Sequence, residues 1–288
     1  MNPDSIHIVA VLGAGTMGNG IAHVFARSGY RVILRDTEKR FLDRALETIS
    51  KNLDREIRKG AVSNAEKEPI LRRIDPVIDI DAISAADFLV EAVPEQIELK
   101  RKLLGEADRI LGPQAIIATN TSSISITMLA AATKRPDRCI GMHFMNPVPV
   151  MPLVEVIRAL QTSAGTFETT MKVCEKLQKK PVAVTDSPGF VSNRVLMPLI
   201  NEAAFCVMEG VAAPESVDAV MKLGMNHPMG PLELADFIGL DVCLDIMEVL
   251  FSGFGDSKFR PCPLLKKMVS AGWLGKKSGR GFYTYSGQ

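Results

Sequence analysis

The amino-acid sequence predicts an α/β fold, with a doubly wound and mainly parallel sheet, followed by a separate all-α C-terminal domain. In the first part of the chain, short β-rich runs alternate with longer helical patterns, which implies crossover connections between parallel strands. Beyond residue 187, strand-like runs nearly vanish. The turn-forming sequence Asp186-Ser187-Pro188-Gly189 separates the two parts, so the predicted domains are residues 1–187 and 188–288.

Each predicted element rests on its own local pattern. The run at residues 6–12 is almost continuously apolar, as expected of a parallel strand that is buried on both faces. Further strands are predicted at 30–34, 88–90, 115–118, 139–144, 153–157 and 181–184. Helices are predicted at 17–28, 38–59 and 95–111 in the first domain, and at 190–209, 214–223, 232–250 and 264–270 in the second.

The segment from about residue 38 to residue 73 is unusually long and charged for a crossover connection. Lys59-Gly60 supply a turn, and Ser63 can cap the start of a second helix. We therefore expect a helical hairpin that projects from the first domain.

The composition narrows the class of protein. The 288 residues include 34 Lys and Arg against 33 Asp and Glu, a net charge of +1, which provides no global field to attract nucleic acid or an acidic membrane. With 47% hydrophobic and 23% charged residues, the chain can bury a sizeable core. A folded protein that binds neither nucleic acid nor membranes is expected.

The cysteines and the N-terminus indicate a reducing, cytoplasmic location. The five cysteines are widely spread and form no C-x-x-C pair, so we expect neither disulfides nor a bound metal. The N-terminus carries Asp4 where a secretory signal carries positive charge. The longest stretch without charged residues, 110–133, is interrupted by Gly, Pro and polar residues and is no spanning helix.

A dinucleotide-binding motif follows the first predicted strand. Gly13-Ala14-Gly15-Thr16-Met17-Gly18 fits G-x-G-x-x-G and opens a helix, as in a Rossmann-type domain, where it binds a pyrophosphate. Asp36 ends the second strand, at the position of an acid that bonds the ribose 2′-hydroxyl. A carboxylate there repels a 2′-phosphate, so NAD is the expected cofactor, although the neighbouring Arg35 opposes this selectivity.

Hydride transfer to or from a nicotinamide requires an acid/base group, and histidine suits that role at neutral pH. Of the four histidines, His7, His23 and His227 lie mid-strand, on a helix and in a loop. His143 lies near the carboxyl end of a predicted strand, where open α/β sheets bind their ligands. His143 is therefore the candidate, with a buried and merely hydrogen-bonded histidine as the alternative.

A single carboxylate, Glu155, stands within the apolar run Leu153–Ile157. An unpaired charge inside such a run is costly, so Glu155 should have a partner. The intervening Pro-containing loop returns the chain toward His143, and an ion pair with it would fix one imidazole tautomer and raise the basicity of the ring. The alternative is an exposed residue on an edge strand.

Seven segments, in order along the chain, match the motifs of one family: residues 13–18, 120–123, 142–148, 153–156, 186–194, 227–231 and 275–283. Through them the sequence resembles the L-3-hydroxyacyl-CoA dehydrogenase family, and within it the short bacterial 3-hydroxybutyryl-CoA dehydrogenases. The resemblance spans nearly the whole chain.

The resemblance implies a role for each matching residue. It implies that His143 is the general acid/base, that Glu155 orients it, and that Ser122 and Asn193 bond the reacting oxygen or the acyl thioester. Glu95, Lys100, Ser122, Asn146 and Lys277 are implied around the nicotinamide half of NAD, and Asn52 and Lys59 of the hairpin are implied at coenzyme A. As alternatives, Ser122 and Ser123 cap a helix starting near Ile124, and Asn193 stabilises a helix start.

The function expected from this resemblance is NAD-dependent interconversion of a short-chain (3S)-3-hydroxyacyl-CoA and the 3-ketoacyl-CoA. Alternatives are a dehydrogenase of another 3-hydroxy substrate, such as 3-hydroxyadipyl-CoA or a sugar acid, and a non-catalytic dinucleotide-binding protein. A homodimer through the second domain is also implied. Met208, Met221, Met225 and Met247 there are either core or dimer interface.

Overall fold

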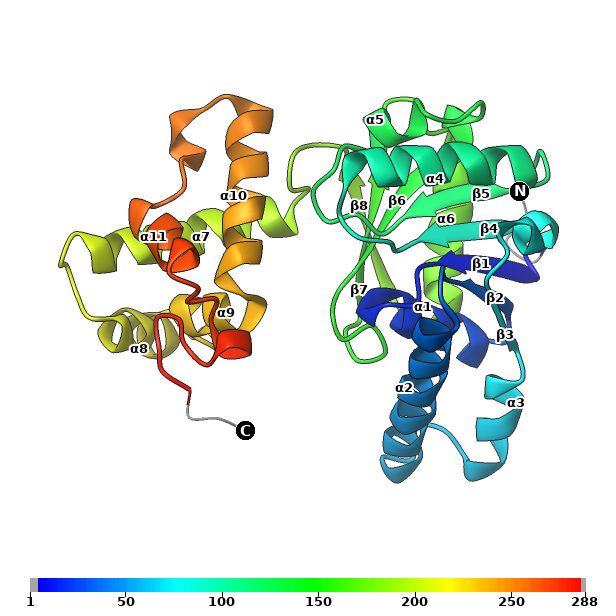
Figure 1. The fold of residues 1–288 in the computed structure, drawn as a ribbon, viewed down its shortest axis with the longest axis horizontal. Helices are drawn as coiled ribbons and strands as arrows, with labels where there is room; N and C mark the ends of the chain where they lie inside the picture. The colour runs from blue at the N-terminus through cyan, green and yellow to red at the C-terminus, as the bar shows by residue number, and fades with distance from the viewer. Residues whose placement is uncertain (1–4, 286–288) are drawn as a thin grey trace. The chain divides into compact units, whose positions relative to one another are not determined.

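The computed structural model describes residues 5–285, which form two compact units that divide between Asp186 and Ser187. The first unit contains one eight-stranded sheet with helices around it (Figure 1). Its strands are β1 (Ile8–Leu12), β2 (Arg31–Arg35), β3 (Ile74–Val77), β4 (Phe88–Glu91), β5 (Ile116–Thr119), β6 (Cys139–Phe144), β7 (Leu153–Arg158) and β8 (Lys180–Thr185). Its α-helices are α1 (Thr16–Arg27), α2 (Lys39–Arg58), α3 (Lys67–Leu71), α4 (Ile97–Ile110), α5 (Ile126–Ala130) and α6 (Ala164–Lys176).

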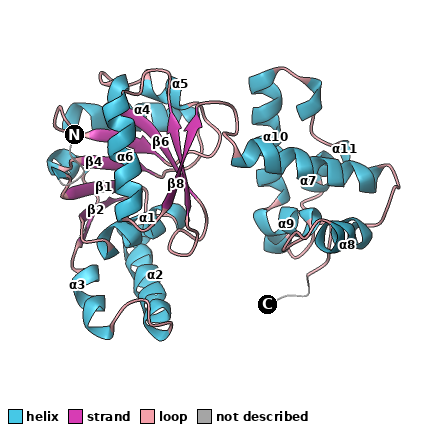
Figure 2. Ribbon diagram, turned by 180° about the vertical axis from the view of Figure 1, so that it is seen from behind, coloured by secondary structure: helices cyan, strands magenta, loops and turns pink. Residues whose placement is uncertain are grey.

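The sheet has the order β3-β2-β1-β4-β5-β6-β7-β8, and every neighbouring pair is parallel except β6 and β7. The predicted doubly wound, mainly parallel sheet is therefore confirmed. The chain order reverses between β1 and β4, and such a reversal opens a crevice at the carboxyl ends of the strands. Helix α4 covers one face of the sheet and α6 the other (Figures 1 and 2).

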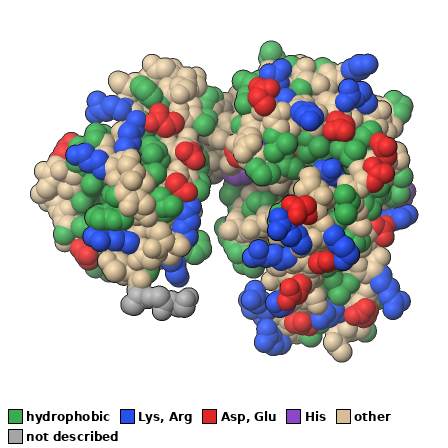
Figure 3. Space-filling model, viewed as in Figure 1, with side chains coloured by type: hydrophobic (Ala, Val, Ile, Leu, Met, Phe, Trp, Pro, Cys, Tyr) green, Lys and Arg blue, Asp and Glu red, His purple; other side chains and the backbone are tan. Residues whose placement is uncertain are grey.

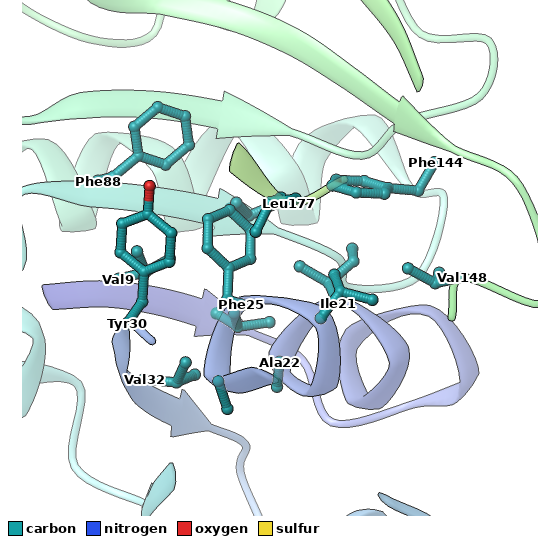
Figure 4. Close-up of a cluster of buried hydrophobic side chains, with 14 of the residues drawn as sticks. Val9, Ile21, Ala22, Phe25, Tyr30, Val32, Phe88, Phe144, Val148 and Leu177 are labelled. Carbon is teal, nitrogen blue, oxygen red and sulfur yellow. The ribbon is translucent and has the colours of Figure 1, made fainter. Parts of the chain in front are cut away.

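Helix α1 packs on the same face as α6. Apolar side chains of α1, among them Ile21 and Phe25, meet Val9, Phe88 and Leu177 in one buried cluster (Figure 4). Burying a large apolar side chain contributes roughly 1.5–3 kcal/mol, so this cluster fixes α1 against the sheet. The N-terminus of α1 is thereby held at the end of β1.

The sequence did not predict β3. This strand lies at the edge of the sheet and contains Pro76, which has no N–H to donate. The predicted hairpin is present just before it, with α2 and α3 projecting from the sheet (Figure 1). Ser63 caps the short helix that precedes α3, and its N–H donates to Glu66 at 2.8 Å.

The second unit is all-helical, as predicted. It consists of α7 (Ser192–Met208), α8 (Pro214–Gly224), α9 (Pro231–Ile238), α10 (Leu240–Phe254) and α11 (Pro263–Ser270). The prediction of one helix over 232–250 was wrong, because the chain breaks between α9 and α10. Gly239 adopts φ +108°, a conformation that an L-residue inside a helix does not take.

Two buried aspartates tie the second unit together. Asp218 of α8 accepts the N–H of Leu232 at 2.9 Å and the hydroxyl of Tyr283 at 2.7 Å. Asp236 of α9 accepts the N–H groups of Phe282 and Tyr283. Burial raises the pKa of Asp236 despite these hydrogen bonds. The last described segment is thus fixed to α8 and α9.

Candidate active site

Four loops meet at the carboxyl ends of the central strands. The glycine-rich turn follows β1, residues 92–96 follow β4, residues 120–125 follow β5, and residues 145–152 follow β6. Because β1, β4, β5 and β6 are mutually parallel, these ends share one edge of the sheet. The sequence-predicted site residues of the first unit lie in or near these loops, apart from those on α2 and in β7.

The three glycines of the turn each meet a different steric requirement. Gly13 adopts φ +97°, and a Cβ there would lie 2.7 Å from the carbonyl oxygen of Ala92. A Cβ on Gly18 would lie 1.7 Å from the carbonyl oxygen of Gly13, so no side chain fits there. Beside Gly15, in contrast, there is open space. The turn is therefore tight at both ends and accessible in the middle, where a pyrophosphate can approach the backbone of α1.

Asp36 braces this turn. One carboxylate oxygen accepts the N–H of Ala14 at 2.7 Å and the other accepts the N–H of Thr37 at 2.6 Å. Arg35 donates from Nε to the carbonyl oxygen of Ile78 at 3.1 Å. This bond holds the Arg35 guanidinium toward the end of the edge strand β3. Arg35 is therefore a weaker argument against selectivity for NAD. An Asp36 carboxylate still has lone pairs that can accept ribose hydroxyls.

A cavity of about 490 Å³ lies beside the glycine turn. It is lined by the turn and the start of α1, by one face of α2, and by residues 146–149. Ala14, Gly15, Thr16, Asn146 and Asn52 line it, which brings predicted cofactor-binding residues and one predicted coenzyme A residue together. The open backbone at Gly15, the helix N-terminus and Asp36 fit a dinucleotide.

His143 and Glu155 are direct partners across the antiparallel β6–β7 ladder. His143 Nδ1 lies 2.8 Å from a carboxylate oxygen of Glu155, and the residues are only 8% and 2% exposed. The expected contact between the two side chains is present, and Glu155 is not an exposed edge residue because β8 covers the far side of β7. Since Nδ1 faces the carboxylate, proton exchange with a substrate is left to Nε2.

Ser122 belongs to a loop whose polar groups donate hydrogen bonds to Glu95. One oxygen of Glu95 accepts the N–H of Ser122 at 2.8 Å, the N–H of Ser123 at 3.1 Å and the hydroxyl of Thr121. Although burial opposes it, the Lys100 ammonium and these donors hold the pKa of Glu95 below its usual value. Glu95 thus remains a carboxylate at neutral pH and orders the loop.

Lys100 links this loop to the core. Its ammonium, on a side chain only 1% exposed, lies 2.7 Å from Glu91 and 3.3 Å from Glu95. Glu91 is fully buried and also accepts the hydroxyl of Thr119 at 2.6 Å. The structure therefore places Lys100 between two carboxylates, where it fixes Glu95. The sequence analysis missed Glu91, although a charge that ends the apolar run at residues 88–90 was a usable signal.

The alternative that Ser122 and Ser123 cap the next helix is wrong. That helix, α5, begins at Ile126 rather than near Ile124, and Ser125 is its cap. Asp186 reinforces the same helix end by accepting the N–H of Thr127 at 2.8 Å and the hydroxyl of Ser125 at 2.7 Å. Ser122 and Ser123 are thereby left to the loop that Glu95 orders.

Two predicted site residues lie in the second unit. Asn193 is in the first turn of α7 and only 8% exposed. It therefore lies at a helix start, where the alternative to a binding role also placed it. Lys277 pairs with Asp241 at 2.6 Å, beside Gly239. Their roles toward cofactor or substrate stay predictions.

Across residues 5–285, no helix has both the length and the apolar character needed to cross a membrane. Within the same range, no cluster of three or more His, Cys, Asp and Glu side chains is arranged to hold a metal ion.

Comparison with known proteins matches both units. The model of the 3-hydroxyacyl-CoA dehydrogenase NAD binding domain matches residues 8–187, and that of the 3-hydroxyacyl-CoA dehydrogenase C-terminal domain matches residues 189–285. The chain is 56% identical over 277 residues to a probable 3-hydroxybutyryl-CoA dehydrogenase of Bacillus subtilis, covering 96% of each chain.

Two further comparisons bear on the substrate. The crystal structure of (S)-3-hydroxybutyryl-CoA dehydrogenase PaaH1 from Ralstonia eutropha is 51% identical with a TM-score of 0.96, over 98% of this chain and 100% of that one. A 3-hydroxyadipyl-CoA dehydrogenase of Escherichia coli is 42% identical over 98% of this chain and 59% of its own length.

Proposed function

The chain belongs to the 3-hydroxyacyl-CoA dehydrogenase family, and from this premise we propose that it interconverts (3S)-3-hydroxyacyl-CoA and 3-ketoacyl-CoA with NAD, on short chains such as 3-hydroxybutyryl-CoA. The single observation that carries the proposal is the buried His143–Glu155 pair at the end of β6, on a sheet that also bears a dinucleotide turn. Higher identity to the relatives named for 3-hydroxybutyryl-CoA than to the one named for 3-hydroxyadipyl-CoA favours the short chain.

Bound NAD supplies the nicotinamide carbon that accepts or returns the hydride. The protein supplies the proton chemistry. In the oxidative direction His143 takes the hydroxyl proton at Nε2, and Glu155 stabilises the imidazolium that forms. In the reductive direction the imidazolium returns that proton to the carbonyl oxygen. The Ser122 hydroxyl, held in its loop by Glu95, is proposed to donate to the oxygen as charge develops on it, and Asn193 is proposed as a second donor.

The cofactor residues proposed are those of the glycine turn (Gly13–Gly18) and Asp36, with Glu95, Lys100, Ser122, Asn146 and Lys277 toward the nicotinamide half. We assign NAD binding to residues 1–187 and substrate binding and dimerisation to residues 188–288. We place the protein in the cytoplasm, as the sequence predicts. These assignments rest on the resemblance and on the geometry of each unit taken separately.

Attraction for coenzyme A must be local, because the net charge is only +1. Arg44, Thr48, Asn52 and Lys59 follow one another at spacings of four or seven residues, which places them along one side of α2 and its C-cap. The first three line the α2 wall of the cavity, so in this proposal coenzyme A shares the cavity with NAD at the glycine turn. Charged side chains crowd the projecting hairpin (Figure 3). We propose that this stripe receives the coenzyme A moiety, with Lys59 at its phosphates.

A dimer through the second unit is supported by its exposed apolar side chains. Val220, Leu223 and Met225 are 62%, 88% and 61% exposed at the end of α8, whereas Met247 is buried in the core. Several exposed apolar side chains near one helix end are typical of an interface between subunits. Of the methionines left open by the sequence, Met247 is thus core, while Met208 and Met225 are available to the proposed interface.

The acid/base role is tested by His143→Ala with acetoacetyl-CoA and NADH, followed at the NADH absorbance. The wild type should oxidise NADH, and the variant should lose roughly a hundredfold to ten-thousandfold in kcat, because general acid–base catalysis contributes that much. NADH affinity should be retained. Undiminished activity in the variant would remove His143 from the mechanism, and an inactive wild type would contradict the proposed reaction.

The coenzyme A stripe is tested by Lys59→Ala, with Lys39→Ala as the matched control on the same helix. Lys39 is paired with Asp43 and, 20 residues before Lys59, lies on the opposite side of α2. Lys59→Ala should raise the KM for acetoacetyl-CoA by up to about fivefold, since an exposed charge pair is worth roughly 0.2–1 kcal/mol. The KM for an acetoacetyl thioester that lacks the nucleotide should not change. Equal effects on both substrates, or in both variants, would count against phosphate contact.

The dimer is tested by light scattering on the wild type and on Leu223→Asp. A charge placed in an apolar interface is costly to bury, so the variant should show the mass of one chain where the wild type shows two. A monomeric wild type would disprove the dimer, and a variant that stays dimeric would move the interface away from α8.

A further inference from the structure

A buried lysine that has no role in the proposed function lies behind the loop at 145–152. Lys179, just before β8, is only 6% exposed. Its ammonium donates to the carbonyl oxygen of Val148 and, at 2.8 Å, to that of Met151. A single side chain, distant from the loop in sequence, thereby holds the loop at two points.

This loop forms one wall of the cavity beside the glycine turn. Residues 146–149 line the cavity, facing the start of α1 and one side of α2. Val148 is 2% exposed, and a Cβ on Gly20 of α1 would lie 2.8 Å from the Cβ of Val148, so the loop is pressed against α1 (Figure 4). The position of this wall therefore decides the shape of the space offered to the cofactor.

The same loop connects His143 to Glu155, but it does not set their separation. These two residues face each other in the β6–β7 ladder, whose hydrogen bonds fix their register. A displaced loop therefore changes the wall of the cavity and leaves the histidine–carboxylate pair in place. Binding and chemistry should respond differently to a change at Lys179.

The surroundings of Lys179 disfavour the charged form of its side chain. Within residues 5–285, no carboxylate lies within ion-pair distance of its ammonium. Burial first, and then Arg27 at the end of α1, lower the pKa of Lys179 to about 8, while Glu56 of α2 opposes them. Glu56 is itself engaged by Arg27 at 2.9 Å and by His23 at 3.5 Å. Residues 145–152 contain no titratable side chain, and Lys176 of α6 lies over the ring of Tyr30.

We propose that Lys179 is a positioning residue for cofactor binding, which holds the loop at 145–152 as the wall of the NAD cavity through its bonds to the carbonyls of Val148 and Met151. The inference rests on the proposed function in so far as NAD occupies this cavity. The ammonium form has three donors and a full charge, whereas the neutral amine has two donors and no charge. The loop is thus held firmly below about pH 8 and progressively less firmly as the pH rises through that value.

The test is the Kd for NADH, measured by its fluorescence between pH 6.5 and 9.5, with no substrate and no turnover. The variants are Lys179→Met, Lys179→Arg and the control Lys180→Met, which removes the neighbouring exposed lysine. At pH 7, Lys179→Met should bind NADH about tenfold more weakly, the loss expected for a charge-assisted hydrogen bond. Its kcat for acetoacetyl-CoA at saturating NADH should stay within about threefold of the wild type, since the ladder is intact.

The pH dependence distinguishes positioning from general stability. The Kd of the wild type and of Lys180→Met should rise above about pH 8. Lys179→Met should show no such rise because it has no proton to lose, and Lys179→Arg should show none because its guanidinium stays charged. The arginine variant keeps the inference testable if the methionine variant does not fold.

Three outcomes would overturn the inference. They are an unchanged Kd in a folded Lys179→Met, an equal loss of affinity in Lys180→Met, and a wild-type rise in Kd that persists in Lys179→Arg. If the wild type bound no NADH at any pH, the proposed function itself would fail and the inference with it. Wild-type binding together with any of the three outcomes would overturn the inference alone.

Discussion

Buried charge has to be paired, and in the first unit each such pairing fixes one part of the candidate site. Glu155 is paired with His143, Glu91 with Lys100, and Lys179 with two loop carbonyls. An uncompensated charge at these depths would cost several kcal/mol, so each partner is held in place by the energy of burial. The candidate acid/base histidine, the loop of Ser122 and the wall of the cavity beside the glycine turn are positioned by the same physical requirement.

The topology of the sheet places these paired side chains at the candidate site. The reversal of strand order between β1 and β4 opens the crevice, and the shared carboxyl ends of four parallel strands place the glycine turn, Glu95, Ser122 and His143 at one edge. Strand β7 returns directly from β6 and pairs with it in the antiparallel direction, which sets Glu155 opposite His143. A further parallel strand would not create this pairing. The charged hairpin, in turn, is where we propose that a nearly neutral chain attracts an anionic thioester.

Much of this arrangement was predictable from the sequence, and the exceptions have physical causes. The glycine turn and Asp36 have fixed spacing, and Glu155 stood out as the one charge in an apolar run. Glu91 and Lys179 were missed because a sequence does not show which charged side chains are buried. The break at Gly239 was missed because a glycine in a helical pattern does not reveal its φ angle. The roles of the second-unit residues Asn193 and Lys277 are predicted only through the family resemblance.

In the proposed mechanism, pairing with Glu155 makes the imidazole of His143 an effective acid/base. Replacing Glu155 with Gln preserves the shape and a hydrogen bond but removes the charge, so it isolates this effect. The direct measurement is kcat for acetoacetyl-CoA reduction by Glu155→Gln, with the Kd for NADH measured in parallel. We expect a loss of about a hundredfold or more in kcat with an unchanged Kd. Wild-type kcat in the variant would rule out this role of Glu155.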